Sequence, residues 1–249
     1  MIDTHAHLYY REKDLAQLIK NAKEAGLSHI INVGIDIKTS LKALDYSKKF
    51  DMILPTIGIH PCNSNNNDSL NELKELALKH PFKAIGEIGL DYFKMYTDKK
   101  TQKQVFIAQL DIAQELNLPI IIHNRHAEED MIEILNTYPN LKKVFHCFGS
   151  GVEFINETHS DTTYYSFTGN ITYAKKGKMI QSIKELPLEK IMIETDSPYL
   201  TPEAYKGQEN EPAFVREIAK KIADVKHLTI EEVITSTTQT ARRFFNIQD

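Results

Sequence analysis

Residues 117–123 read Asn117-Leu118-Pro119-Ile120-Ile121-Ile122-His123, and this short stretch indicates the fold. The three consecutive isoleucines form an apolar run of the kind expected of a strand that is buried on both faces in a parallel sheet. The amphipathic segment before it, 102–116, has the spacing of a helix, and Asn117 and Pro119 mark its end. A second amphipathic segment covers 128–138. The local order is therefore helix, buried strand, helix.

The same rhythm runs along the whole chain, with further amphipathic segments at 15–25 and 70–78. The apolar runs that predict strands are 1–4, 29–33, 53–59, 84–88, 120–123, 144–146, 164–168 and 191–195. Strands that alternate with helices indicate a parallel sheet. A (β/α)8 TIM barrel needs about 250 residues, and this chain has 249.

We therefore predict an α/β fold, a single (β/α)8 barrel domain that spans residues 1–249. A doubly wound open sheet is the competing fold, but no Gly-rich phosphate loop follows the first predicted strand. The polar segment 63–67 is interpreted as a surface loop.

Composition excludes several classes of protein. The chain is 41% hydrophobic and 26% charged, as soluble globular proteins are. It shows neither a basic segment leading into an apolar one at the N-terminus nor an apolar run of about 18 residues, so we expect a cytoplasmic protein that does not enter a membrane. Two cysteines, Cys62 and Cys147, are too few for a disulfide scaffold. The net charge of −4 argues against a long electrostatic footprint on duplex nucleic acid.

Histidines and acids gather at the ends of the predicted strands. In a barrel these positions converge on the C-terminal face, where active sites of such enzymes lie. His5 and His7 are two residues apart in an extended segment, so their side chains point to the same side and can chelate one ion. The full set of strand-end residues is His5, His7, His60, Glu87, His123, His146 and Asp196.

Each of these residues has a simpler interpretation when it is taken alone. A His-x-His pair arises by chance in surface loops, and a lone histidine in a core is more often a satisfied core residue than a ligand. Glu87 lies inside an apolar strand, where an unpaired carboxylate costs several kcal/mol, so it needs a salt bridge or a metal. Asp196 stands two residues before Pro198 and suits a turn. Taken together, they predict a binuclear metal site for hydrolysis, although spacing alone leaves phosphoryl, amide, lactone and deaminase substrates open.

The sequence also resembles a known family, the TatD-type deoxyribonucleases of the metal-dependent hydrolase superfamily. The resemblance covers essentially the whole chain and is carried by blocks that occur in the family's order. They are Asp3-Thr4-His5-Ala6-His7-Leu8, Gly58-Ile59-His60-Pro61, Gly86-Glu87-Ile88-Gly89-Leu90-Asp91-Tyr92, Pro119-Ile120-Ile121-Ile122-His123, His146-Cys147-Phe148-Gly149-Ser150, Thr168-Gly169-Asn170-Ile171-Thr172, Glu194-Thr195-Asp196-Ser197-Pro198-Tyr199-Leu200-Thr201-Pro202 and Asn210-Glu211-Pro212.

The resemblance implies a (β/α)8 barrel that hydrolyses DNA with divalent metals, often from a 3′ end. It also implies that two ions are bound, and family members are usually described as Mg- or Mn-dependent, whereas the histidine-rich ligands themselves favour Zn or Mn over Mg on grounds of softness. The first would be held by His5, His7, Glu87 and Asp196, and the second by Glu87, His123 and His146. The expected partner is DNA, as single-stranded ends, with no obligate protein partner and a monomeric chain.

Asp196 and Glu87 are the expected catalytic residues, together with His60 as a phosphate ligand or proton donor. A solvent-facing loop is the simpler interpretation of His60. Arg125 is expected to contact phosphate with its planar guanidinium. Tyr92 is expected to stack on a base or bind a phosphate, with packing at the barrel rim as the simpler interpretation.

Two positions depart from the family pattern. His126 replaces an acid, which leaves any role carried over to that position in doubt, and Thr240 stands where the family often has Asn. We interpret the Thr240 change as structural and the segment 237–241 as the start of a helix. No aromatic platform for stacking bases is evident from the sequence.

Two other functions compete with the nuclease. One is a hydrolase of the same superfamily that acts on a lactone, an amide or a phosphotriester. Many such relatives bridge their metals with a lysine, often carboxylated, whereas Glu87 occupies that position here. The other is a non-enzymatic binding barrel, which the competent residues at all six ligand positions disfavour.

Overall fold

The computed structural model describes residues 1–65 and 69–248. Along these residues, eight strands alternate with helices in the order of a (β/α)8 fold. The strands are β1 (Ile2–Ala6), β2 (His29–Asn32), β3 (Ile53–Pro55), β4 (Ile85–Asp91), β5 (Ile120–Arg125), β6 (Lys143–Phe145), β7 (Thr163–Phe167) and β8 (Ile191–Ile193). The α-helices are α1 (Leu15–Glu24), α2 (Ile37–Ser47), α3 (Ser69–Lys79), α4 (Lys99–Leu116), α5 (Glu128–Leu135), α6 (Val152–Thr158), α7 (Lys178–Glu185), α8 (Val215–Lys226) and α9 (Ile230–Phe245). Short 3-10 helices are η1 (Leu8–Asp14), η2 (Pro61–Asn63), η3 (Gly169–Tyr173), η4 (Leu188–Lys190), η5 (Glu203–Tyr205) and η6 (Pro212–Phe214).

The chain divides into two compact units. Unit 1 comprises Met1–Asn32, Cys147–His159 and Tyr164–Asp249, and unit 2 comprises Val33–His146 and Ser160–Thr163. The prediction that residues 1–249 form one domain stays a prediction.

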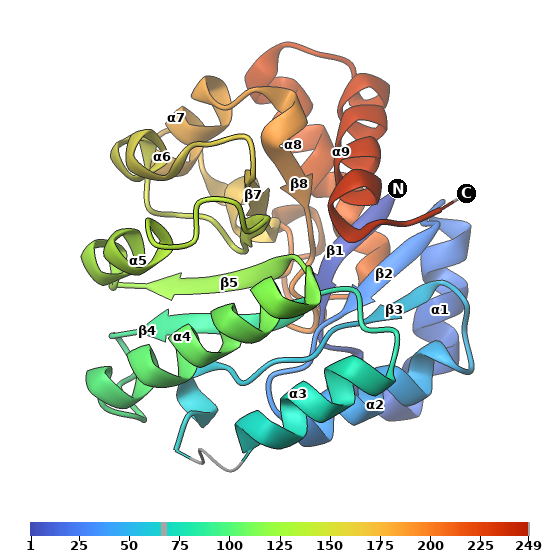
Figure 1. Cartoon of the computed structure of the whole chain (residues 1–249). Coiled ribbons are helices and arrows are strands. Elements are labelled where there is room, and N and C mark those ends of the chain that lie inside the picture. The colour runs from blue at the N-terminus through green and yellow to red at the C-terminus, as the bar shows by residue number, and fades with distance from the viewer. Residues whose placement is uncertain (66–68, 249) are drawn as a thin grey trace. The chain divides into compact units, whose positions relative to one another are not determined.

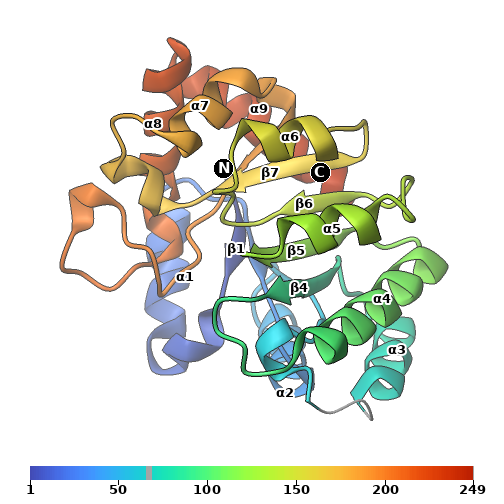
Figure 2. The same ribbon diagram turned by 90° about the vertical axis from the view of Figure 1, so that its left-hand side faces the viewer.

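Unit 1 contains the adjacent parallel strands β7, β8, β1 and β2. Strand β1 pairs with β2, and β7 pairs with β8. Strand β8 lies beside β1, where the Thr4 hydroxyl donates a hydrogen bond to the Ile193 carbonyl at 3.0 Å. Helix α7 packs against both α6 and α8, and α8 packs against α9 (Figure 2).

Unit 2 contains the adjacent parallel strands β3, β4, β5 and β6. Strand β5 pairs with both β4 and β6. Beyond β3, Ile57 forms a parallel bridge with Ile85 at the start of β4. Helix α4 packs along β4, and α3 packs against α4 (Figure 1). Strand β4 is buried at every position, which confirms the prediction of strands covered on both faces.

Capping residues explain where several helices begin and end. Asp36 and Thr39 form a capping box at the start of α2, and Thr229 and Glu232 form another at the start of α9. Asn117 ends α4 in the left-handed conformation, as the Asn-Leu-Pro sequence predicted. None of the helices in the described part of the chain is long and apolar enough to span a membrane.

Three sequence-based boundaries differ from the structure. The predicted strand 53–59 is longer than β3; beyond β3, the buried Thr56 hydroxyl donates to the Gly86 carbonyl and Ile57 forms only an isolated bridge. Strand β4 runs on to Asp91, because its ladder with β5 continues to Arg125. The helix start predicted at 237–241 is wrong: those residues lie inside α9, which begins at Ile230 after the Thr229 cap.

The structural interpretation of Thr240 agrees with its surroundings. Its hydroxyl is buried and donates a hydrogen bond to the Glu189 carbonyl at 3.2 Å. In the predicted loop 63–67, Asn63 ends η2, whereas Asn66 and Asn67 lie outside the described residues.

Candidate metal centre

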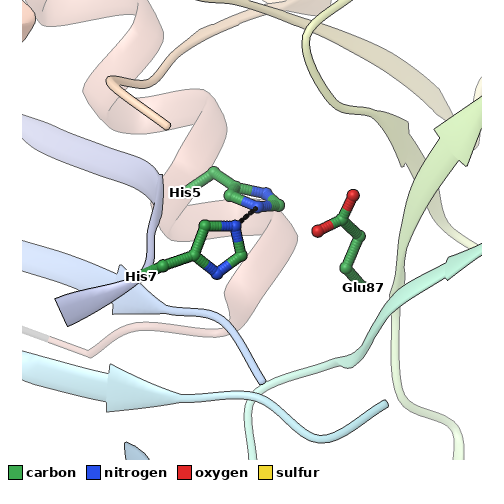
Figure 3. Close-up of side chains that lie close together, drawn as sticks. All are labelled: His5, His7 and Glu87. Carbon is green, nitrogen blue, oxygen red and sulfur yellow. Dashed lines mark hydrogen bonds between the residues drawn. The ribbon is translucent and has the colours of Figure 1, made fainter. Parts of the chain in front are cut away.

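Unit 1 gathers His5, His7 and Asp196 into one cluster. The two Nε2 atoms of His5 and His7 lie 3.2 Å apart, and Figure 3 shows this contact between the edges of the two rings. The Oδ1 atom of Asp196 is 3.7 Å from Nε2 of His5 and 3.4 Å from Nε2 of His7. Both imidazoles are almost completely buried. Three ligand atoms therefore converge at the end of β1.

Backbone and side-chain bonds hold this first cluster in place. The Asp196 N–H donates to the His5 carbonyl at 2.8 Å, which fixes the segment after β8 against β1. The buried carboxylate of Asp3 accepts the N–H and the hydroxyl of Thr195 at 2.9 and 2.6 Å. The Tyr9 hydroxyl lies 2.7 Å from Nδ1 of His7, so Nε2 of that ring is directed toward His5 and Asp196.

Unit 2 gathers three of the predicted residues around Glu87. The Oε1 atom of Glu87, on β4, is 2.8 Å from Nδ1 of His123 and 2.9 Å from Nε2 of His146. Nε2 of His60 lies 3.4 Å from the same oxygen. Burial raises the pKa of the Glu87 carboxyl, but the neighbouring imidazoles, His146 first, hold that pKa well below its ordinary value. A buried carboxylate is thus kept ionised by the histidines that surround it.

His60 contributes its Nε2 atom and not its Nδ1 atom to this cluster. Its Nδ1 accepts the Cys62 N–H at 3.1 Å, which leaves the ring proton on Nε2 in the neutral imidazole. Burial lowers the pKa of His60, which favours that neutral form. The simpler interpretation of His60 as a solvent-facing loop residue is not what the structure shows.

Asp91 is a further member that sequence reasoning missed. Its Oδ2 atom lies 3.2 Å from Nε2 of His123, while Nδ1 of the same ring faces Glu87. Although burial raises the pKa of Asp91, the hydrogen bond to His123 and the backbone N–H of Lys94 hold it below its ordinary value. Its even spacing from Glu87 was the available signal, because residues four apart in a strand share a face.

Glu194 is a second buried acid that was not predicted to act at the site. It is 1% exposed, and its Oε1 atom accepts the Cys147 N–H at 2.7 Å. The sequence feature that could have indicated its role is its position at the end of an apolar predicted strand, two residues before Asp196. Neither Cys147 nor Cys62 takes part in a disulfide bond within the described residues.

The donor set of each cluster fits a divalent ion. Two ligands at about 2.0–2.2 Å from one ion, at ordinary coordination angles, lie about 3 Å apart. The ligand atoms of unit 1 are separated by 3.2–3.7 Å and those around Glu87 by 2.8–3.4 Å. Imidazole nitrogens and carboxylate oxygens are also the ligand types that Zn and Mn accept.

The two predicted substrate residues lie outside the clusters. The Arg125 guanidinium lies 4.0 Å above the ring of Phe93. The Tyr92 hydroxyl donates to Asp130 at 2.5 Å, and the Lys99 ammonium lies 4.2 Å above the Tyr92 ring. Neither contact tests the predicted roles in substrate binding.

Comparison with known proteins identifies the family. The family model "TatD related DNase" matches residues 2–246. A Bacillus subtilis protein described as an uncharacterized metal-dependent hydrolase, YabD, is 38% identical, with 99% of each chain covered. The 3'-5' ssDNA/RNA exonuclease TatD of Erwinia tasmaniensis is 32% identical over 94% of this chain and 95% of its own.

A solved structure confirms the predicted fold class. The TatD homologue YJJV of Escherichia coli has a TM-score of 0.92 at 24% identity, covering 100% of this chain and 98% of that one. The fold is thus the α/β, (β/α)8 fold expected from the alternation of strands and helices. The chain belongs to the TatD-related DNase family and is a metal-dependent hydrolase.

Proposed function

We propose that this hydrolase is a divalent-metal-dependent deoxyribonuclease that cleaves phosphodiester bonds of DNA, working from 3′ ends of single strands. The observation that carries the proposal is the pair of histidine–carboxylate clusters at strand ends, with ligand atoms 2.8–3.7 Å apart. The name of the Erwinia relative, a 3'-5' ssDNA/RNA exonuclease, supports the choice of substrate and direction.

The proposal assigns the ligands of two ions. His5, His7 and Asp196 would hold one ion, and His123 and His146 would hold the other. Glu87 would contribute to both, because its two carboxylate oxygens allow one residue to bridge. The imidazole-rich ligand set favours Mn or Zn on grounds of softness, and Mg is the third ion to test.

Bound divalent ions supply Lewis acidity at the phosphoryl group and lower the pKa of a coordinated water. The residues of the chain position the reactants. Asp196 would orient the attacking water and accept its proton. His60, whose Nε2 carries the ring proton, would donate to the phosphoryl or leaving oxygen. Arg125 would contact the phosphate backbone of the strand, and Tyr92 would contact a base or phosphate beside it.

A nuclease assay across metals tests the proposal. Purified protein is incubated with Mg, Mn or Zn and with single-stranded or duplex oligonucleotides labelled at either the 3′ or the 5′ end. We expect stepwise shortening from the 3′ end of single strands. If DNA and RNA stay intact with every ion while a lactone or phosphotriester is hydrolysed, the nuclease proposal is wrong and the alternative hydrolase is favoured.

A substitution at the proposed bridge separates metal loss from unfolding. Glu87→Ala should lose bound metal, measured by elemental analysis, together with activity. Glu133→Ala, at an exposed position on α5 in the same unit, is the matched control and should change neither. Full activity in Glu87→Ala would overturn the assignment of the bridge.

A further inference from the structure

The segment between β4 and α4 exposes large apolar side chains. Phe93 is 59% exposed, Met95 44% and Tyr96 66%, with the exposed Lys94 between them. We call residues 93–96 the aromatic loop. Contiguous exposed apolar surface is uncommon on soluble proteins and marks interaction sites.

Buried hydrogen bonds hold the aromatic loop at both ends. The side chain of Gln102, on α4, is 1% exposed. Its Nε2 donates to the carbonyls of Asp91 and Thr97 at 3.0 and 2.8 Å, and its Oε1 accepts the Asp91 N–H at 2.8 Å. Because both ends are fixed, the fold itself presents these side chains to solvent.

The aromatic loop is joined directly to the Glu87 cluster. The Oδ1 atom of Asp91 accepts the N–H groups of Phe93 and Lys94 at 3.0 and 2.8 Å. The other oxygen of the same carboxylate lies 3.2 Å from His123. One side chain therefore links the loop to a proposed metal ligand.

Cations accompany the exposed rings. Arg125 lies 4.0 Å above the Phe93 ring, and the Lys94 ammonium lies 5.8 Å above the Tyr96 ring. The ring of His126, the position that departs from the family pattern, is 5.4 Å from that of Phe93. Aromatic faces beside cations are the combination that binds single-stranded nucleic acid, since bases stack on the rings while the cations attract phosphates.

A neighbouring hollow does not suit phosphate. It has a volume of about 470 Å³ and is lined by Tyr92, Lys99, His126, Ala127, Glu128, Glu129 and Asp130. Three acids against one lysine disfavour an anion there. The charge pattern thus directs a polyanionic strand to the face that carries Arg125 and Lys94.

We propose that the aromatic loop is the base-binding part of the site, with a base of single-stranded DNA stacked on Phe93 and Arg125 on the adjoining phosphate. This inference rests on the proposed nuclease function. The sequence alone showed no stacking platform, because exposure of these rings depends on the Gln102 bonds and cannot be seen from composition.

Binding of a hydrolysis-resistant phosphorothioate oligonucleotide in the presence of Mn tests the inference by fluorescence anisotropy. Phe93→Ala should weaken the Kd for single-stranded DNA by about five-fold or more. Phe93→Trp keeps a stacking face and should bind as the wild type does. Leu78→Ala removes an apolar side chain of 60% exposure from α3 in the same unit and is the matched control, with an unchanged Kd.

Oligonucleotides with one abasic site, moved along the strand, identify the contact. The loss caused by Phe93→Ala should vanish when the base that stacks on Phe93 is absent. An unchanged Kd in Phe93→Ala, or an equal loss with every abasic oligonucleotide, overturns the inference while wild-type cleavage of DNA leaves the proposed function standing. If the wild type neither binds nor cleaves DNA or RNA, both fall.

Discussion

Replacing Asp91 by asparagine tests how the second cluster is organised. In the wild type, Nε2 of His123 faces the Asp91 carboxylate at 3.2 Å, and Nδ1 faces Glu87 at 2.8 Å. A carboxylate accepts only, so when Nδ1 is bound to a metal the Asp91 carboxylate would hold the remaining ring proton on Nε2. In Asp91→Asn, the amide NH2 can occupy the same place and donate to Nε2, which moves the ring proton to Nδ1 and blocks the ligand atom.

The expected magnitude follows from the role of such a supporting carboxylate. Loss of one costs about 10–100-fold in metal affinity or activity. The asparagine oxygen can still accept the N–H groups of Phe93 and Lys94, so the fold should be retained. Isothermal titration of the apoprotein with Mn or Zn measures the affinity, and thermal unfolding checks the fold.

Asp51→Asn is the matched control, because Asp51 is an exposed acid of the same unit and the change in formal charge is identical. The reasoning is refuted if Asp91→Asn binds both ions as tightly as the wild type does, or loses no more affinity than Asp51→Asn.

Further predictions concern stability. Burial lowers the pKa of Lys143 from 10.5 to about 8, and its ammonium donates a hydrogen bond to the Thr162 hydroxyl at 3.3 Å. Lys143→Met should therefore raise the free energy of unfolding at pH 7, by up to about 3 kcal/mol. The same change at the exposed Lys142 should not raise it. The gain in stability from Lys143→Met should shrink between pH 8 and 10, because the unfolded wild-type chain then binds more protons than the folded one and wild-type stability rises. Urea titrations at several pH values measure both effects. A gain in stability that is constant with pH would contradict the assigned cause. Thr229→Ala removes the capping box of α9 and should lower the free energy of unfolding by about 1 kcal/mol in the same assay; no change would mean that packing alone fixes that helix end.

The sequence was sufficient for the parts of the fold and site that follow from local rules. A buried strand is recognised by a continuous apolar run. In a parallel barrel, the residues at the C-terminal ends of neighbouring strands lie on the same face of the barrel. This placed Glu87, His123 and His146 together, and the spacing of two placed His5 beside His7. The clusters in each unit agree with these placements.

What the sequence did not reveal depends on contacts between distant residues. The position of Asp91 is set by its register with Arg125 across β4 and β5, and a one-residue slip would move its side chain to the other face. The sequence of 237–241 suggested a helix start, but the capping box at Thr229 and Glu232 determines where α9 begins. In that case specific hydrogen bonds between side chains and backbone, and not the residue types of the local segment, fix the helix boundary.

The ligand set and the choice of substrate are carried by different residues. Histidines and carboxylates at strand ends are suited to the proposed hydrolysis by a metal-activated water, and the same constellation would serve amide and lactone substrates equally well. A distinction between these substrates has to come from what surrounds the ligands. In unit 2, Asp91 connects the proposed ligand His123 to a loop whose exposed rings lie beside Arg125 and Lys94. A lactone or amide offers neither a base to stack nor a phosphate to pair, so the base-binding role proposed for this loop favours a nucleic acid strand as the substrate.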